Sequence, residues 1–205
     1  MTPDHVNTVI VGGGQAGLAM SAHLSEQGID HLVIERDRIA ERWRTARWDS
    51  LVANGPAWHD RFPMLEFEDC DGDGFPTRDS VVRYFETVAE RIDAPVRCGV
   101  EVKRAARLPS GRGFRIETSD GVVTADHVVA ATGPFQTPVI PPVVPDGVIK
   151  QIHSCHYRNP EQLEDGGVLV VGAGSSGSQI ADELLWSGRD VWLSVGPHHR
   201  PPRSY

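Results

Sequence analysis

The chain has 205 residues, of which 40% are hydrophobic and 23% are charged, and its formal net charge is -8. This length suits one complete domain and part of another, and the composition is that of an ordinary globular protein. The acidic balance without a basic cluster argues against a nucleic-acid partner, and no apolar run approaches the roughly 20 residues that cross a bilayer. Three widely spaced cysteines favour a reducing cytoplasm over a disulfide framework.

The first predicted element is a short apolar strand, Val6–Val11, that runs directly into glycines. It lacks the basic leader and the cleavage site of a secretory signal, so we interpret it as a strand. A turn of sequence Gly12-Gly13-Gly14-Gln15-Ala16-Gly17 follows, then a helical stretch and a second strand, His31–Glu35. This order is typical of the βαβ unit that opens a dinucleotide-binding fold.

Each glycine of such a turn has its own role. Gly12 permits the tight turn, Gly14 lets a diphosphate approach the backbone, and Gly17 lets helix and strand pack closely. The helix that follows offers its first N–H groups and a partial positive charge to the diphosphate. Glu35 ends the second strand, where a carboxylate accepts hydrogen bonds from ribose hydroxyls. The alternative is a simple glycine loop followed by a solvated glutamate.

A helix is predicted after Thr77, which has the chemistry of an N-cap. Apolar residues recur behind it at helical spacing, at Val81, Phe85, Val88 and Ile92. Three strands are predicted next, Val96–Leu108, Phe114–Thr118 and Val122–Ala131, with a hairpin turn at residues 119–121 between the last two. They predict a β-meander inserted in the dinucleotide fold.

The last of these strands ends in Ala131-Thr132-Gly133, small residues that allow the backbone to come close to a bound cofactor. Residues 134–147 then carry five prolines, which predict an extended connection and a domain boundary.

The sequence repeats itself at an offset of 160 residues. Residues 8–17 align without a gap with residues 168–177, whose turn reads Gly172-Ala173-Gly174-Ser175-Ser176-Gly177. A second strand follows at Val191–Val195, so Val195 takes the place of Glu35, and Arg200 comes shortly after it. A neutral strand end followed by a guanidinium favours NADP over NAD, because a carboxylate there would repel a 2′-phosphate. The alternative for Arg200 is a solvated residue in a tail.

These motifs, in this order, resemble the flavin-containing monooxygenase family, whose relatives include N-hydroxylating and Baeyer–Villiger monooxygenases. The resemblance covers nearly the whole chain. Besides the two glycine turns it rests on Glu35-Arg36, Arg42-Trp43-Arg44, residues 48–56 with Asn54-Gly55-Pro56, Ala131-Thr132-Gly133 with Pro138 and Pro141, and His153-Ser154 with Tyr157. The segment 147–157 matches the family fingerprint FxGxxxHxxxY/W in part, since its opening Phe is replaced.

The resemblance implies FAD at the first unit and NADP at the second. The expected FAD-binding residues are Gly12, Gly14, Gln15, Ala16, Gly17, Glu35, Arg36, Arg42, Trp43, Ala131, Thr132 and Gly133. The expected NADP-binding residues are Gly172, Gly174, Ser175, Ser176, Gly177 and Arg200. Asn54 matches an asparagine beside the flavin where oxygen reacts, and is the expected catalytic residue. The alternative is that residues 54–56 are merely a turn.

The fold class expected is α/β. A Rossmann-like FAD-binding domain with an inserted β-meander occupies residues 1–152, and the start of a second Rossmann-like NAD(P)-binding domain occupies residues 153–205. The second domain is expected to be truncated, and this chain alone incomplete as an enzyme, because a dinucleotide domain needs further strands to close its sheet. Another chain of a homo-oligomer is one way to complete it.

The implied activity is monooxygenation. NADPH reduces the flavin, O2 gives a peroxyflavin, and one oxygen atom passes to a small nucleophilic or carbonyl substrate. One alternative is an NAD(P)H-dependent flavin reductase without oxygenation, although the CxxC of disulfide reductases is missing. Another is a non-catalytic nucleotide-binding fragment. No metal is expected, because the spacing of His153, Cys155 and His156 matches no standard site.

Overall fold

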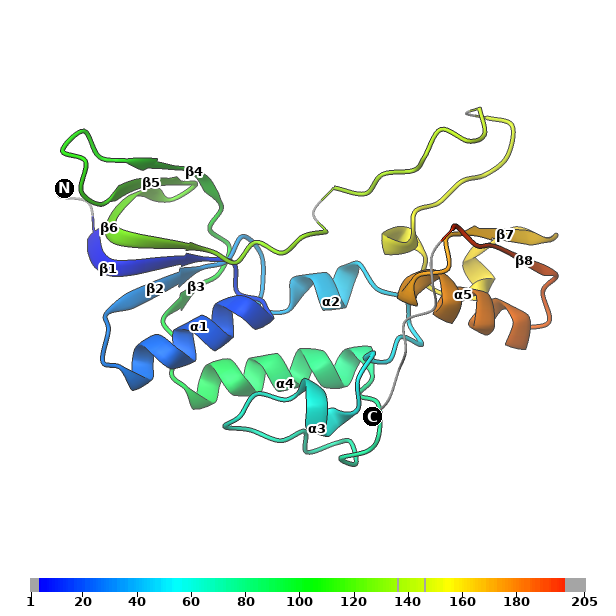
Figure 1. Cartoon of the computed structure of the whole chain (residues 1–205), viewed down its shortest axis with the longest axis horizontal. Helices are drawn as coiled ribbons and strands as arrows, with labels where there is room; N and C mark the ends of the chain where they lie inside the picture. Colours follow the sequence, from blue (N-terminus) through cyan, green and yellow to red (C-terminus); the bar gives the residue numbers. More distant parts are fainter. Residues whose placement is uncertain (1–3, 136, 146, 198–205) are drawn as a thin grey trace.

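The first βαβ unit consists of β1 (Asp4–Val11), α1 (Gln15–Glu26) and β2 (His31–Ile34). This computed structural model of the chain describes residues 4–135, 137–145 and 147–197. The two strands pair in parallel, with Val11 opposite Ile34 at their carboxyl ends. The glycine turn therefore lies at the carboxyl edge of the sheet, where dinucleotide folds bind their ligands (Figure 1).

The first sheet has six strands in the order β3-β2-β1-β6-β5-β4. The remaining strands are β3 (Val96–Arg97), β4 (Val102–Arg107), β5 (Phe114–Thr118) and β6 (Gly121–Ala130). β6 returns parallel to β1, while β5 pairs antiparallel with both β6 and β4. The β-meander is thus confirmed, and so is the α/β fold class.

The single strand predicted over residues 96–108 is wrong. The chain forms β3, leaves the sheet at residues 98–101, and re-enters as β4 at the opposite edge. Gly99 has a φ of +73°, and its N–H donates to the Asp37 carbonyl. The N–H of Val100 donates to the Glu35 carbonyl. The apolar residues continue across this break, so their pattern alone does not reveal it.

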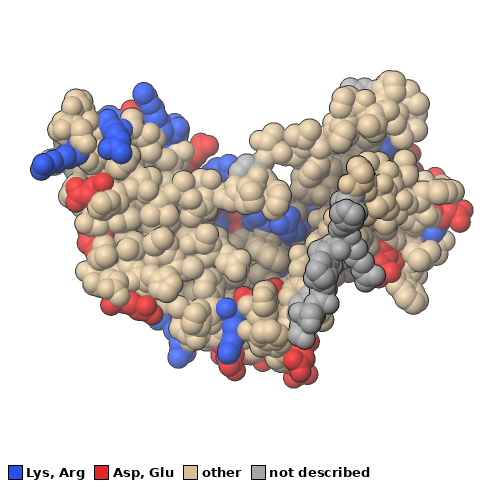
Figure 2. Space-filling model, viewed as in Figure 1, with Lys and Arg blue, Asp and Glu red and all other residues tan. Residues whose placement is uncertain are grey.

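The meander brings basic residues together that are separated in the sequence. Lys103, Arg104 and Arg107 are exposed on β4, an edge strand, and Figure 2 shows Lys and Arg side chains gathered over this end of the molecule. The sequence expectation of no basic cluster is therefore incomplete. Positive charge along an edge strand also discourages pairing with another sheet.

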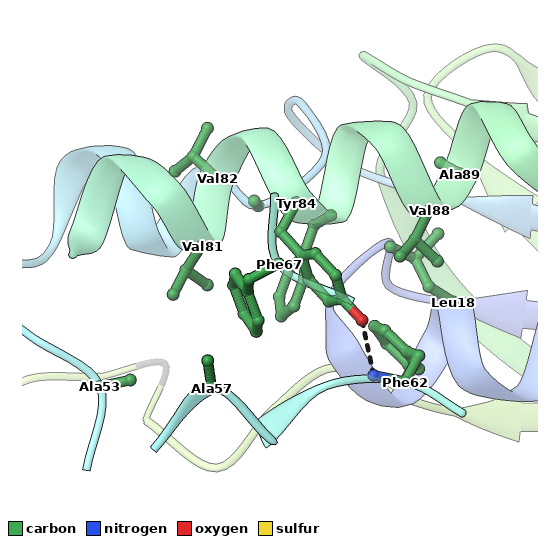
Figure 3. Close-up of a cluster of buried hydrophobic side chains, with 12 residues drawn as sticks. Leu18, Ala53, Ala57, Phe62, Phe67, Val81, Val82, Tyr84, Val88 and Ala89 are labelled. Atoms are coloured by element: carbon green, nitrogen blue, oxygen red, sulfur yellow. Dashed lines mark hydrogen bonds between the residues drawn. The ribbon is translucent and has the colours of Figure 1, made fainter. Parts of the chain in front are cut away.

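Helix α4 (Arg78–Arg91) begins as predicted, because the Thr77 side chain accepts a hydrogen bond from the N–H of Ser80 at 3.2 Å. Its apolar face enters a cluster of buried side chains shared with α1 and the loop 53–67 (Figure 3). Within that cluster the hydroxyl of Tyr84 accepts from the N–H of Phe62 at 2.7 Å and donates to the carbonyl of Leu65 at 2.6 Å. These bonds hold an irregular loop against a helix.

Two short helices in this region, α2 (Glu41–Thr45) and α3 (Ala57–Asp60), were not predicted. Trp48 is buried, as expected of a packing residue. Trp58, by contrast, is 48% exposed. Trp58 lies on α3, a single helical turn of which only Ala57 is buried.

The second βαβ unit consists of β7 (Val168–Val171), α5 (Ser175–Trp186) and β8 (Val191–Ser194). Two short 3-10 helices, Ser154–His156 and Pro160–Gln162, precede it. Helix α5 covers one face of the two-stranded sheet. On the other face Leu169, Val171 and Trp192 are each more than half exposed.

The repeat at 160 residues is confirmed hydrogen bond by hydrogen bond. The pairing of Val171 with Ser194 repeats that of Val11 with Ile34. The N–H of Gly12 donates to the Ile34 carbonyl at 2.8 Å, and the N–H of Gly172 donates to the Ser194 carbonyl at 3.0 Å. Both helices span twelve residues.

The two units meet through a small apolar cluster, which we call the contact cluster. Trp48 and Leu51, from the loop after α2, pack with Tyr157 and with Ile180 and Leu184 of α5. Elsewhere the connection 134–150 forms neither helix nor strand in its described residues (Figure 1). The domain boundary at residue 152 stays a prediction. Within the described ranges, no helix is long and apolar enough to cross a membrane.

Candidate dinucleotide sites

The first glycine turn has the close approaches that its three predicted roles require. Gly12 has a φ of +112°, and a Cβ atom there would lie 2.4 Å from the Ala131 carbonyl oxygen. A Cβ atom on Gly17 would lie 1.9 Å from the Gly12 carbonyl oxygen. By contrast, nothing lies within 4 Å of a Cβ built on Gly14. The turn is therefore tightly packed at Gly12 and Gly17 and has open space at Gly14, where a diphosphate could approach the backbone.

Helix α1 begins directly at this opening. Gly14 is its N-cap and makes no side-chain capping bond, and Gln15 and Ala16 of the first turn are exposed. The first N–H groups of a helix have no partner inside the helix and carry partial positive charge. An anion placed above Gly14 would receive them.

Glu35 lies beside the turn, one residue beyond β2. One carboxylate oxygen accepts from the N–H of Gly13 at 2.7 Å, and the other accepts from the N–H of Asp37 at 2.9 Å. These bonds fix the carboxylate at the carboxyl edge of the sheet. Arg36, next to it, pairs with Asp37 at 3.1 Å.

The strand end 131–133 joins the same edge. The N–H of Ala131 donates to the Val11 carbonyl at 2.8 Å, and Gly133 has a φ of +75°. The chain then passes Arg42, whose guanidinium donates to the Phe135 carbonyl at 2.6 Å. The structure thereby brings residues 131–135 together with the first turn and with α2, although they are about a hundred positions apart in sequence. Thr132 lies within this segment.

Trp43 is half-buried between two apolar clusters, one around α4 and the other the contact cluster. The guanidinium of Arg47 lies 5.7 Å from its ring centroid, a cation–π distance. Burial, and then the nearby charge of Arg42, lower the pKa of Arg47. Sequence reasoning missed Arg47. Arg47 lies two residues beyond the end of α2, so no helical spacing signalled its contact with Trp43.

The second turn repeats this geometry with one difference. Gly172 has a φ of +100° and a Cβ on Gly177 would lie 1.8 Å from the Gly172 carbonyl oxygen, but a Cβ on Gly172 would meet nothing within 4 Å. Gly174 is open as well, and Ser175 and Ser176 begin α5. Val195 follows β8 where Glu35 follows β2, and it is 61% exposed. Arg200 lies outside the described residues.

Asn54 lies in the loop between α2 and α3, against the second unit. Its side-chain oxygen accepts from the Nε2 of Gln179 on α5 at 3.1 Å. Sequence reasoning missed Gln179, because nothing in one sequence connects positions 125 residues apart. The structure thus places the expected catalytic asparagine beside α5, the helix that follows the second glycine turn.

The sulfur atoms do not form a redox pair. Cys70, Cys98 and Cys155 are all free. Burial is the main cause that raises the pKa values of Cys70 and Cys98, which makes their thiolates less available. In the part of the chain that the structure describes, no group of three or more His, Cys, Asp or Glu side chains is arranged to hold a metal.

The profile of the pyridine nucleotide-disulphide oxidoreductase family matches residues 9–201, which include both turns. The chain belongs to this family. An uncharacterized oxidoreductase of Geobacillus kaustophilus, named CzcO-like, is 40% identical over 194 residues, covering 93% of this chain and 54% of that protein. The family membership agrees with two dinucleotide units in one chain.

Two further relatives of the family carry the resemblance to flavin-containing monooxygenases. The indole-3-pyruvate monooxygenase YUCCA6 of Arabidopsis thaliana is 33% identical over 198 residues, covering 91% of this chain and 47% of that protein. The solved flavin-containing monooxygenase of Stenotrophomonas maltophilia has a TM-score of 0.83 and 26% identity, covering 97% of this chain and 59% of the other. The resemblance stated from sequence is confirmed. The chain spans about half the length of the curated relatives it matches.

Proposed function

We propose that this chain supplies the two nucleotide sites of an FAD-dependent, NADPH-using monooxygenase, FAD at the first turn and NADP at the second. The observation that carries the proposal is the pair of turns. Both are open above their middle glycine and both lead into a helix N-terminus, yet one strand ends in Glu35 and the other in Val195. Two similar sites with different ribose neighbours suit two different dinucleotides.

At the first site, Gly12, Gly14 and Gly17 with Gln15 and Ala16 would hold the FAD diphosphate. Glu35 would accept hydrogen bonds from the ribose, and its carboxylate is already held in place by the N–H groups of Gly13 and Asp37. The remaining contacts would come from Arg36, Arg42, Trp43, Ala131, Thr132 and Gly133. Family membership and the relatives' names support this assignment.

At the second site, Gly172, Gly174 and Gly177 with Ser175 and Ser176 would hold the NADP diphosphate. Val195 leaves the strand end uncharged, so a 2′-phosphate would meet no carboxylate there, and Arg200 would pair with it.

Bound FAD would supply hydride acceptance and oxygen activation. The chain's own contribution would be to bind and orient the two nucleotides and to hold Asn54 at the flavin. The substrate proposed is a small nucleophile or a carbonyl compound, with O2 as cosubstrate. A side-chain acid or base is not needed for hydride transfer.

The test is a visible absorption spectrum of the purified chain with FAD, recorded without oxygen, then after NADPH, and then in air. Bleaching by NADPH followed by a lasting flavin–oxygen adduct supports the monooxygenase. Bleaching followed by immediate reoxidation to H2O2 supports the alternative, a flavin reductase. Bound FAD that NADPH leaves oxidised would mean that this chain acts alone only as a nucleotide-binding fragment.

A further inference from the structure

We infer that Gln179 is a positioning residue that sets the orientation of the Asn54 carboxamide. This inference deepens the proposed function and rests on it. The bond from Gln179 Nε2 to Asn54 Oδ1 is 3.1 Å long, within the range of a well-formed hydrogen bond. It is a direct side-chain bond between the loop of the first unit and α5 of the second.

The backbone around Asn54 is fixed on both sides. The N–H of Ala53 donates to the Pro76 carbonyl at 2.8 Å. The N–H of Gly55 donates to a carboxylate oxygen of Asp60 at 3.2 Å, and a Cβ atom on Gly55 would lie 2.5 Å from the other oxygen of that carboxylate. The backbone therefore determines where the Asn54 side chain starts.

The starting point of Gln179 is fixed as well. Its neighbour Ile180 and, one turn on, Leu184 are buried in the contact cluster against Trp48 and Leu51. Glu183 accepts a hydrogen bond from the Tyr157 hydroxyl at 2.6 Å. These contacts fix the position of α5 against the loop that leads to Asn54. They therefore also fix the backbone of Gln179 relative to Asn54.

The chemistry of the bond gives it a direction. A glutamine NH2 group donates and an asparagine carbonyl accepts, and the oxygen and nitrogen of a carboxamide point to opposite sides of its carbon. With its oxygen held toward α5, the Asn54 amide presents its NH2 group in another direction. An asparagine that stabilises an oxygen atom at a flavin must present N–H, because oxygen lone pairs accept hydrogen bonds. Gln179 selects that orientation.

Gln179 also adjoins the second turn. It lies four residues after Ser175 and three after Ser176, the spacings at which helical side chains are neighbours. Gln179 therefore lies on the same side of α5 as the two serines, while its hydrogen bond goes to Asn54.

The kinetic test measures the H2O2 released per NADPH oxidised. It uses the native, FAD-loaded protein and compares the wild type, Gln179→Ala, Asn54→Ala and the double variant. We expect Gln179→Ala to raise H2O2 release about fivefold, the factor that corresponds to one ordinary hydrogen bond. The rate of flavin reduction by NADPH should stay unchanged. The double variant should release no more H2O2 than Asn54→Ala alone, because Gln179 acts through Asn54. Additive effects, or slower flavin reduction in Gln179→Ala, would overturn the inference.

Two variants refine the test. Gln179→Glu keeps the shape but replaces the donor by an acceptor, so it should turn the Asn54 amide around and release at least as much H2O2 as Gln179→Ala. Gln151→Ala is the matched control, since Gln151 is also a half-buried glutamine and donates to the Val144 carbonyl at 3.3 Å. It should behave as the wild type, and uncoupling equal to that of Gln179→Ala would count against a specific role.

A readout without cofactor separates this inference from the proposed function. In the FAD-free chain labelled with 15N, the side-chain NH2 signals of Asn54 should shift in Gln179→Ala and stay in place in Gln151→Ala. Unshifted signals would overturn the inference while leaving the proposed function intact. Failure of the wild-type protein to bind FAD would overturn both.

Discussion

Gly12 and Ala131 lie so close together that a Cβ atom on Gly12 would stand 2.4 Å from the Ala131 carbonyl oxygen. Gly172, in the equivalent position of the second unit, has a similar φ but open space where that Cβ would be. Alanine substitutions at Gly12 and Gly172 therefore separate the free-energy cost of backbone strain from that of a steric clash.

Gly12→Ala is therefore expected to destabilise the chain by about 3 kcal/mol or more, from strain and clash together. Gly172→Ala should cost about 1–2 kcal/mol, from strain alone. Urea unfolding at neutral pH measures both. Equal losses would show that β6 moves away from the turn at little cost.

Replacing Glu35 by Gln or Ala should weaken FAD binding by about 10–100-fold, since a charged hydrogen bond to a ribose is lost together with the support of the Gly13 N–H. The quenching of FAD fluorescence on binding measures the affinity. Glu26→Gln, an exposed carboxylate at the end of α1, is the control and should bind FAD as the wild type. Full FAD affinity in Glu35→Ala would remove Glu35 from the site.

Val195→Glu should weaken NADPH binding by about tenfold while affecting NADH less, because a carboxylate repels the 2′-phosphate. Arg200→Ala should also weaken NADPH binding more than NADH binding. Titrations with both nucleotides give the ratios. The same loss for NADPH and NADH in both variants would contradict the NADP assignment.

Tyr157→Phe should reduce the loss of stability at alkaline pH. Burial, then the hydrogen bond and the charge of Glu183, raise the pKa of the Tyr157 hydroxyl far above its ordinary value. The bond therefore contributes fully below pH 10, the ordinary pKa of tyrosine, and its contribution falls as the unfolded chain ionises above that pH, by at most about 1.4 kcal/mol per pH unit.

Urea unfolding at pH 8 and pH 11 checks this. At pH 8 the variant should be about 1–2 kcal/mol less stable than the wild type, because the 2.6 Å bond to Glu183 is lost. At pH 11 the difference should shrink. A constant difference at both pH values would mean that Tyr157 ionises alike in the folded and unfolded chain.

Arg158→Ala should destabilise the chain by about 2–3 kcal/mol. Its guanidinium donates to the carbonyls of Arg47, Cys155, Tyr157 and Thr45, which belong to both units. Arg158→Lys should recover less than half of the loss, because an ammonium lacks the planar fork that reaches several carbonyls. Thermal unfolding measures all three variants, and Arg91→Ala, at an exposed arginine that ends α4, should cost less than about 0.5 kcal/mol.

Much of the fold follows from local sequence signals. Glycine spacing and the Thr77 cap each act over a few residues, and both are confirmed. The break at Gly99 was missed because the tertiary path of the chain, and not its hydrophobic pattern, ends the strand there. The contacts of Asn54 with Gln179 and of Arg158 with the carbonyls of Thr45 and Arg47 join residues more than a hundred positions apart, which local patterns do not report.

The gapless correspondence of the two βαβ units has a structural meaning. Strand register, helix length and turn bonds are kept at an offset of 160 residues, although most of the aligned side chains differ. One of these differences is at the residue just beyond the second strand, Glu35 in the first unit and Val195 in the second. Exchanging these two residues would therefore change one side chain at the end of each unit and leave intact the backbone that both units share.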